Sequence, residues 1–199
     1  MLSMPEMALV FGAYLLGAIP FGLLFTRWLA GKDPRKHGSG NIGATNTMRT
    51  GGKALGLMTL AADIGKGALP VALALRFGGD LLTAMTAGAA FLGHIFPVYL
   101  RFRGGKGVAT MFGVLLPWQP LVAGIAFGIW LLALAIGRYV SVASILAALS
   151  LPPLAHALHA SDTTVMADIL FSLMVLLRHG SNIRKVMAGT EDRIGNRKH

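Results

Sequence analysis

The stretch LVAGIAFGIWLLALAIG, residues 121–137, decides the class of fold to which this chain belongs. It holds no charged residue, and its apolar side chains would cover every side of a helix. Such a helix is stable where hydrocarbon surrounds it, whereas a surface helix of a water-soluble protein keeps a polar face. The stretch therefore predicts a helix that crosses a membrane.

The rest of the chain has the same character. Of its 199 residues 54% are hydrophobic and only 13% are charged, which is too apolar for a soluble domain of this length. We expect an all-α integral membrane protein, a single polytopic domain over residues 1–199. Its apolar runs predict seven transmembrane helices, at residues 5–29, 54–77, 81–100, 108–117, 121–137, 140–159 and 164–178.

Two of these runs differ from an ordinary transmembrane helix in position or length. Residues 5–29 resemble a signal peptide in position, but no small-residue cleavage site precedes Lys32, so we expect this run to be retained as a span. Residues 108–117 would rise only ~15 Å as a helix against a hydrocarbon core of ~30 Å. This short segment is tilted, extended, or half of a re-entrant hairpin with residues 121–137.

The basic residues predict the orientation. The net charge of +10 comes almost wholly from loops that alternate spans place on one side, while Arg76 lies in a loop on the other side and Lys66 within a helix. Because basic loops stay in the cytoplasm, we expect the N-terminus outside and the C-terminus inside. The charge therefore indicates topology and not binding to nucleic acid.

The absence of cysteine excludes disulfides, thiolate metal sites and cysteine nucleophiles. The histidines and acidic residues show no compact metal-binding pattern. We expect neither a metal nor another cofactor.

The first basic loop, residues 37–49, reads HGSGNIGATNTMR. Its glycines would let backbone N–H groups approach an oxyanion, and Arg49 could bind a phosphate through two hydrogen bonds. Gly38 to Gly43 match the dinucleotide-binding fingerprint, but they follow a membrane helix and not a strand, so we reject that match. A flexible linker of turn residues is the alternative to an anion-binding loop.

The second basic loop, residues 101–107, reads RFRGGKG. It is not a nucleotide-binding P-loop, because Leu100 and Gly107 occupy positions where that motif needs glycine and a hydroxyl residue. Backbone donors and Lys106 would still suit a phosphate, especially if a helix begins at residues 107–109 and points its positive end at the anion. An ordinary basic loop is the alternative.

Two further segments on the same side are weaker indicators. Residues 179–191 form a polar stretch after the last apolar run, and such tails commonly do no more than contact headgroups. Residues 138–144 include Ser141 and Ser144, which are more typical of helix caps and packing than of ligand binding.

Asp63 and Lys66 stand three residues apart near the middle of an apolar run, on one helical face. Charges at that depth are costly, which makes them candidates for function, although a mutually neutralising pair that packs helices is an equal alternative. His94, near a predicted helix end, is more typical of a hydrogen-bonded packing residue than of a ligand.

Taken in order, GSGNIGATN (38–46), GHIFP (93–97), GGKGVAT (104–110) and residues 179–191 resemble one family. It is the bacterial membrane glycerol-3-phosphate acyltransferase family that uses acyl phosphate as donor. The resemblance runs from about residue 10 to 192 and includes DIGKG at 63–67. Residues 185–188, KVMA, depart from the family's leucine-rich pattern, whereas His179, Asn182, Gly189 and Glu191 match it.

The resemblance implies a seven-helix bundle in the bacterial cytoplasmic (inner) membrane, with its active site at the cytoplasmic face. It implies transfer of a fatty acyl group from acyl phosphate to the 1-hydroxyl of glycerol 3-phosphate. The products would be 1-acylglycerol 3-phosphate (lysophosphatidic acid) and phosphate, in the first step of phospholipid synthesis. The partners would be these two substrates and the lipid bilayer, with no nucleic acid and no obligatory protein partner.

Matching positions imply the site residues. The acyl-phosphate headgroup is assigned to Ser39, Gly40, Gly43, Ala44, Thr45, Asn46, Gly104, Gly105 and Ser144. Glycerol 3-phosphate is assigned to Arg49, Lys106, His179 and Asn182. These four residues and Ser39 are the expected catalytic set.

An acyl phosphate is already activated, so the protein mainly has to position two anionic headgroups and stabilise the leaving phosphate. Either His179 or an oxygen of the donor phosphate could accept the proton of the attacking hydroxyl. We favour the donor phosphate, since the resemblance implies a substrate-assisted reaction. No histidine here has an aspartate after four intervening residues, the dyad of another acyltransferase class.

Two other functions would account for parts of this sequence. A transporter for an anion or phosphorylated metabolite would use buried charges such as Asp63 and Lys66. However, the glycine-rich loops are predicted at one face and not at the midplane, and no inverted repeat is apparent. A purely structural membrane anchor would not need three such segments.

Overall fold

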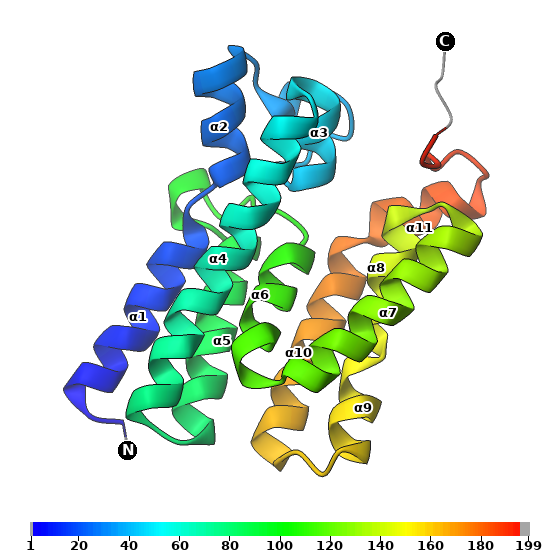
Figure 1. Ribbon diagram of the computed structural model, residues 1–199. Helices are drawn as coiled ribbons and strands as arrows, with labels where there is room; N and C mark the ends of the chain where they lie inside the picture. The colour runs from blue at the N-terminus through cyan, green and yellow to red at the C-terminus, as the bar shows by residue number, and fades with distance from the viewer. Residues whose placement is uncertain (1, 196–199) are drawn as a thin grey trace. The chain divides into compact units, whose positions relative to one another are not determined.

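The computed structural model describes residues 2–195, and in this part of the chain all regular structure is helical. The all-α prediction is therefore confirmed. The chain divides into two compact units, Met1–Trp118 and Gln119–His199. Unit 1 contains α1 (Met4–Ala18), α2 (Phe21–Ala30), η1 (Pro34–Lys36), α3 (Ala44–Gly51), α4 (Lys53–Phe77), α5 (Asp80–Ile95), η2 (Val98–Leu100) and α6 (Val108–Trp118) (Figure 1). Unit 2 contains α7 (Pro120–Gly137), α8 (Val140–Leu149), α9 (Leu151–Ala157), α10 (Asp162–Arg178) and α11 (Gly180–Met187).

Every predicted apolar run forms helix. Five stretches of the described chain are long and apolar enough to cross a membrane: Met4–Ala30, Lys53–Phe77, Asp80–Leu100, Pro120–Gly137 and Val140–Ala157. A sixth candidate is the pair α10 and α11, which is bent by 54°. The segment predicted to be short is α6, whose 11 residues rise ~16 Å, about half the hydrocarbon core.

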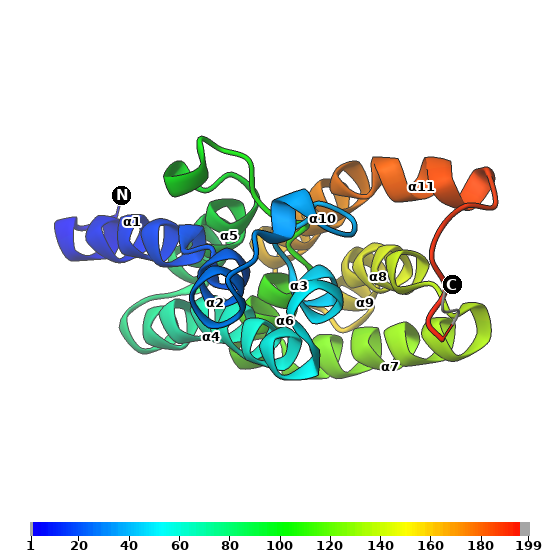
Figure 2. The ribbon, with the colours of Figure 1, turned by 90° about the horizontal axis from the view of Figure 1, so that it is seen from above.

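Glycines allow the helices of unit 1 to pack closely. A Cβ on Gly17 of α1 would overlap the backbone of Ala90 in α5, and one on Gly93 of α5 would overlap the carbonyl of Tyr14. Close backbone approach at small residues is the usual way in which membrane helices associate, because lipid provides no hydrophobic force between them. Viewed end-on, α3 lies beside α2 and α4 at one end of this unit (Figure 2).

The first span is broken between α1 and α2. Pro20 has no N–H group and stands at the break, where Ile19 is the C-cap of α1 and Pro20 precedes α2. The Ile19 carbonyl accepts hydrogen bonds from the N–H of Phe21 at 3.1 Å and from Lys66 Nζ at 2.9 Å. The lysine thus satisfies a carbonyl that the helix break exposes.

In unit 2, α8 packs against α7, α10 and α11 (Figure 2). Ser172 of α10 donates a hydrogen bond to the Ala148 carbonyl of α8, and Gln119, which precedes α7, donates to Asp168 of α10 at 3.2 Å. After α11 the chain returns to the corner between α7 and α8, where Arg138 donates to the Ile194 carbonyl and Arg193 donates to the Tyr139 hydroxyl.

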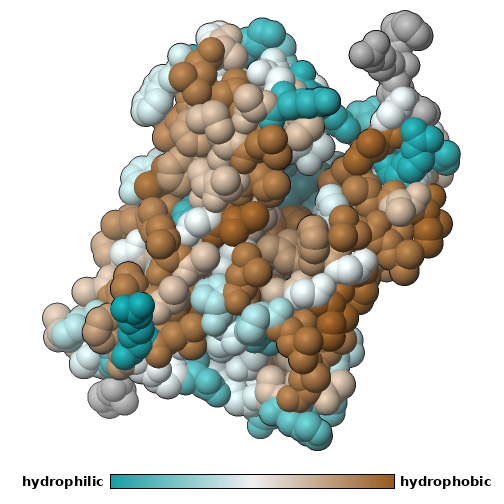
Figure 3. Space-filling view, in the orientation of Figure 1, coloured by the Kyte–Doolittle hydropathy of each residue, from teal (hydrophilic) through white to brown (hydrophobic). Residues whose placement is uncertain are grey.

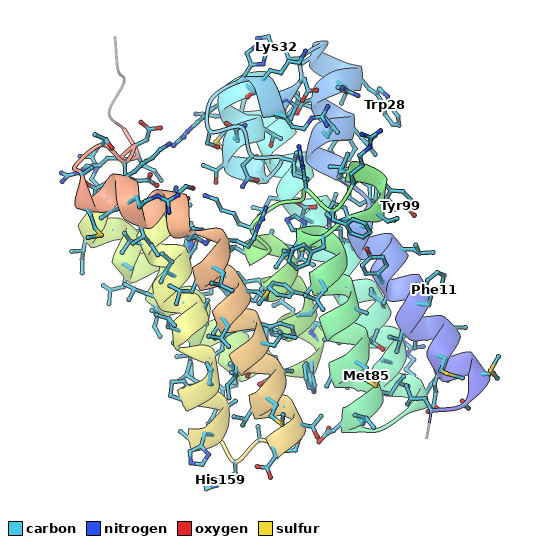
Figure 4. The ribbon with its side chains drawn as sticks, turned by 180° about the vertical axis from the view of Figure 1, so that it is seen from behind. Phe11, Trp28, Lys32, Met85, Tyr99 and His159 are labelled. Carbon is cyan, nitrogen blue, oxygen red and sulfur yellow. The ribbon has the colours of Figure 1, made fainter. Side chains whose placement is uncertain are left out.

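Large apolar side chains are exposed along the helices, as lipid-facing surfaces require. In the view of Figure 3 hydrophobic residues cover much of the helical flanks. Figure 4 shows Phe11 and Trp28 pointing outward from α1 and α2, where they are 64% and 75% exposed. The multi-pass membrane assignment therefore agrees with the surface as well as with the helix lengths.

Candidate active site

The first glycine-rich loop is organised by the side chain of Asn46. This residue is 2% exposed, and its Nδ2 lies within 3.1 Å of the carbonyl oxygens of Pro34, His37 and Asn41. Its Oδ1 accepts a hydrogen bond from the N–H of Ser39 at 2.9 Å. One buried amide thus holds the loop in shape, so Asn46 is committed to the backbone of residues 34–41.

Glycine is needed at two positions of this loop. Gly38 and Gly40 have φ of +59° and +72°, in the left-handed region that other residues rarely adopt. A Cβ on Gly38 would also overlap Asn46 Oδ1. The loop therefore passes directly over the Asn46 amide.

The second half of the segment, which the sequence indicated only as a loop, is the helix α3. It begins at Ala44 after Gly43 as N-cap, without a capping side chain. The first N–H groups of a helix have no partner within the helix, and they carry its positive end. The side chains of Ser39, Thr45 and Arg49, on and beside this helix, are exposed.

Two of the arginines near this loop are paired. Arg35 and Arg27 both bond to Asp33, with Nη2 to Oδ2 distances of 2.7 and 2.8 Å. Hydrogen bonds from Arg35, supported by Arg27, hold the pKa of Asp33 well below its usual range. This ion pair fixes the turn through η1 that leads into the glycine-rich loop.

The second glycine-rich loop is built onto the end of α5. The N–H groups of Gly104 and Gly105 bond to the carbonyls of Ile95 and His94, each at 3.1 Å. A Cβ on Gly104 would overlap the His94 carbonyl, and one on Gly105 would overlap the His94 ring. The glycines thus hold the backbone just before Lys106 against α5, and α6 begins at Val108, as the sequence predicted.

Beneath this loop lies a buried charged cluster. Lys66 Nζ is 2.7 Å from Asp63 Oδ1, and the same oxygen is 3.6 Å from His94 Nδ1. All three residues are 2% to 4% exposed. Asp63 and Lys66 lie on one helical face, as predicted, and they form the ion pair that the sequence left as an alternative to a role in function. His94 joins them from α5.

In unit 2, Asn182 of the predicted site and Ser141 meet at Glu191. Glu191 Oε1 accepts hydrogen bonds at 2.6 Å from both Asn182 Nδ2 and Ser141 Oγ. His179 is buried between α10 and α11, and its Nδ1 donates to the Val175 carbonyl at 2.8 Å, since a carbonyl oxygen can only accept. The hydrogen on Nδ1 leaves Nε2 as the acceptor nitrogen of the neutral ring.

Ser144 is also buried. Its hydroxyl donates to the Val140 carbonyl at 2.7 Å and lies 3.2 Å from Trp130 Nε1, which donates to it. Sequence reasoning missed the roles of Trp130 and Glu191. The family pattern marked Glu191, but only the fold brings it to Ser141, fifty positions away in the chain.

The chain matches a family model described as glycerol-3-phosphate acyltransferase over residues 7–189. A glycerol-3-phosphate acyltransferase of Mesorhizobium japonicum is 50% identical over 191 residues, which cover 95% of each chain. That of Nitrosospira multiformis is 44% identical over 199 residues and 98% of each chain.

A solved structure gives the same result in three dimensions. The crystal structure of PlsY (YgiH), an integral membrane glycerol 3-phosphate acyltransferase in its glycerol 3-phosphate form, is 38% identical, covers 96% of each chain and superposes with a TM-score of 0.93. A second structure of PlsY, in its lysophosphatidic acid form, is 36% identical with a TM-score of 0.89. These likenesses span both units and far exceed what chance or a shared composition could give, so this multi-pass membrane protein is an acyltransferase and belongs to the glycerol-3-phosphate acyltransferase family.

Proposed function

We propose that this enzyme transfers a fatty acyl group from acyl phosphate to the 1-hydroxyl of glycerol 3-phosphate, releasing lysophosphatidic acid and phosphate. The observation that carries the proposal is the likeness to PlsY in two forms, one with glycerol 3-phosphate and one with lysophosphatidic acid. The first is the acceptor and the second the product of this reaction. In the cell the reaction would begin phospholipid synthesis.

The basic loops favour acyl phosphate as the donor. Acyl phosphate and glycerol 3-phosphate each bring a phosphate to the site, and two like charges at close range repel unless cations and dipoles surround them. Arg49, Lys106 and the first turn of α3 supply positive charge of this kind. In the proposal these protein groups carry the electrostatic role.

The donor headgroup would bind at the start of α3. Ser39 and Thr45 would donate from their hydroxyls, with Gly40, Gly43 and Ala44 forming the surrounding backbone. We assign Asn46 to shaping this loop, because its amide is occupied by loop backbone atoms. Gly104 and Gly105 would act by allowing close approach, since their N–H groups bond to α5. Ser144 would complete the donor site from α8.

Glycerol 3-phosphate would bind through Arg49, Lys106, His179 and Asn182. The contact between Asn182 and Glu191 orients the amide, so that Glu191 supports the assigned residue without touching substrate. Ser39 and these four residues form the proposed catalytic set.

The acceptor's 1-hydroxyl oxygen attacks the acyl carbonyl carbon, the bond from this carbon to the phosphate oxygen breaks, and the hydroxyl proton passes to an oxygen of the departing phosphate. No covalent enzyme intermediate is needed, because the mixed anhydride is already activated. His179 would position the acceptor. Its alternative role as base would use Nε2, since Nδ1 holds its hydrogen toward Val175.

We further propose that residues 1–199 form one polytopic domain with seven spans in the bacterial cytoplasmic membrane. The N-terminus would lie outside and the C-terminus in the cytoplasm, with both glycine-rich loops at the cytoplasmic face. The support is the distribution of basic residues, because Arg76 is the only loop cation of the sequence that would lie on the opposite face.

Purified protein in lipid vesicles, supplied with a synthetic acyl phosphate and glycerol 3-phosphate, tests the proposal. We expect phosphate release and lysophosphatidic acid only when both substrates are present, and none when acyl-coenzyme A replaces acyl phosphate. Activity with acyl-coenzyme A alone would overturn the donor assignment. Uptake of glycerol 3-phosphate into the vesicles without acyl transfer would indicate a transporter instead.

A further inference from the structure

The charged cluster of unit 1 connects two places that are far apart in the chain. At one end Lys66 Nζ bonds to the Ile19 carbonyl at 2.9 Å and lies 5.8 Å from the centre of the Phe21 ring. Both of these residues flank Pro20, at the break in the first span. At this end the cluster therefore holds the break between α1 and α2.

At its other end the cluster meets the second glycine-rich loop. His94 faces Asp63 with Nδ1, whereas its Nε2 lies against the backbone of Gly105, where no Cβ would fit. The Gly105 N–H also bonds to the His94 carbonyl. The position of the His94 ring thus sets how closely this loop, with Lys106, can settle onto α5.

The first glycine-rich loop rests on the same break. Gly22, two residues after Pro20, packs against the carbonyl of Ile42 so closely that a Cβ would overlap it. Ile42 is buried and lies in the loop that leads into α3. Both glycine-rich loops are therefore fixed to one framework, the first through α2 and the second through His94.

Simple packing does not explain this arrangement. A buried ion pair is often no more stabilising than apolar residues of the same size, and three buried ionisable groups in a pair of membrane helices are costly to keep. Lys66 bonds to one specific acceptor, the Ile19 carbonyl, which the helix break at Pro20 leaves exposed. The His94 ring packs against one specific glycine, Gly105. Such matching controls position more than it contributes stability.

We propose that Asp63, Lys66 and His94 are positioning residues that hold the two phosphate-binding loops in register through the break in the first span. None of them touches substrate in this proposal, which rests on the function proposed above. Their loss would move Lys106 relative to α3 and weaken the binding of glycerol 3-phosphate while the reacting groups remain present.

The test compares His94→Leu with His94→Asn. Asparagine places an amide nitrogen near the position of Nδ1, so the contact with Asp63 can persist, whereas leucine removes it. We expect His94→Leu to raise the KM for glycerol 3-phosphate about tenfold with kcat changed by less than about threefold. His94→Asn should restore part of the KM, because it keeps the contact with Asp63 but lacks the ring that lies against Gly105. A lower melting temperature with an unchanged KM in His94→Leu would overturn the proposal.

The double variant Asp63→Asn with Lys66→Met tests whether the pair acts by positioning the loops or only by neutralising its own charges. Each single variant leaves an unpaired buried group, so the double variant should melt above both single variants. Its KM for glycerol 3-phosphate should nevertheless stay raised above the wild-type value, because the Ile19 carbonyl has lost the hydrogen bond from Lys66. If the double variant has the wild-type KM, the pair serves only helix packing, and the proposal is contradicted.

Asp168→Asn is the matched control, since Asp168 is also a buried carboxyl within a membrane helix and bonds to Gln119 in unit 2. We expect it to change stability without changing KM. If neither the wild type nor this control transfers an acyl group, the proposed function fails. The positioning role is then read from amide exchange, which His94→Leu should accelerate at Gly104 and Gly105; unchanged exchange there would overturn it.

Discussion

Gly31 and Gly38 share a backbone conformation but differ in their surroundings. Their φ values are +62° and +59°, yet a Cβ on Gly31 would meet no atom within 4 Å, whereas one on Gly38 would overlap Asn46 Oδ1. The pair therefore separates the cost of a left-handed alanine from the cost of disturbing the Asn46 amide.

We expect Gly31→Ala to lose about 1 kcal/mol of stability, the usual cost of the left-handed conformation, and Gly38→Ala to lose more, because its Cβ also overlaps Asn46 Oδ1. Only Gly38→Ala should also raise the KM for acyl phosphate, because its Cβ displaces the amide that holds Ser39. Thermal unfolding in detergent and steady-state kinetics measure the two effects. An equal KM in both variants would show that Asn46 does not shape the donor site.

Arg49 is the arginine that we assign to the phosphate of glycerol 3-phosphate. A hydrogen bond to a charged group contributes about 1.5–3 kcal/mol, so Arg49→Ala should raise the KM for glycerol 3-phosphate at least about tenfold. Ser39→Ala should instead raise the KM for the donor. Arg76→Ala is the control, since it removes the same charge at the far end of α4, beside the opposite loop. A KM for glycerol 3-phosphate that stays unchanged in Arg49→Ala would contradict the assignment.

The residues of the candidate site could be predicted from the sequence, but the role of each residue could not. The glycines, hydroxyls and cations were visible as a pattern. That Asn46 bonds to three loop carbonyls, or that Glu191 joins Ser141 to Asn182, depends on contacts across 5 to 50 positions that no spacing rule specifies. An amide or carboxylate in a polar motif can shape a loop as readily as it can bind a ligand.

At the scale of helices, hydropathy predicted where each apolar run lies but not where it breaks. Residues 5–29 form α1 and α2, and residues 140–159 form α8 and α9 and the turn that follows them. The breaks occur at Pro20 and at Ser150, which precedes Pro152. The mean hydropathy of a run does not show where a proline, which lacks an N–H group, interrupts the helix. The helix α3 was missed for the opposite reason, because its polar sequence has no apolar face long enough to indicate a helix.

The contact between α4 and α6 can be tested with two glycines of the same helix. A Cβ on Gly67 would lie 2.7 Å from the Thr110 carbonyl oxygen, whereas one on Gly65 would meet nothing within 4 Å. We expect Gly67→Ala to lower the melting temperature and Gly65→Ala to leave it unchanged or raise it, since alanine favours helix by about 1 kcal/mol. Equal melting temperatures would exclude close packing at Gly67.

The turn through η1 should respond to pH. The lowered pKa of Asp33 means that its ion pairs stabilise the fold above the unfolded pKa of ~4, and that this contribution is lost as pH falls through the folded pKa. Because Arg27 and Arg35 are half exposed, the gain is at most about 1 kcal/mol. The stability difference between wild type and Asp33→Asn should stay constant above pH ~5 and shrink below pH ~4. A difference that grows on acidification would contradict the pairing.

At the scale of the whole molecule, the distribution of charge predicts how the chain lies in its membrane. The natural chain has no cysteine, so a single introduced thiol reports its own side unambiguously. In intact spheroplasts a membrane-impermeant maleimide should label Gly79→Cys, in the loop between α4 and α5, but not Lys36→Cys. Lys36→Cys should react only after the membrane is permeabilised. The reverse pattern would invert the proposed orientation.

The carbonyl of Ile19 has a consequence for biosynthesis. Placing one charged residue at the centre of a membrane helix costs ~2.5–3.5 kcal/mol during insertion, and α4 carries two such residues, Asp63 and Lys66. The acceptor that receives Lys66 belongs to the first span, which leaves the ribosome earlier. The break at Pro20 thus exposes the Ile19 carbonyl in the bilayer before α4 is inserted. Because its acceptor is already in place, Lys66 can be paired as soon as α4 enters the membrane.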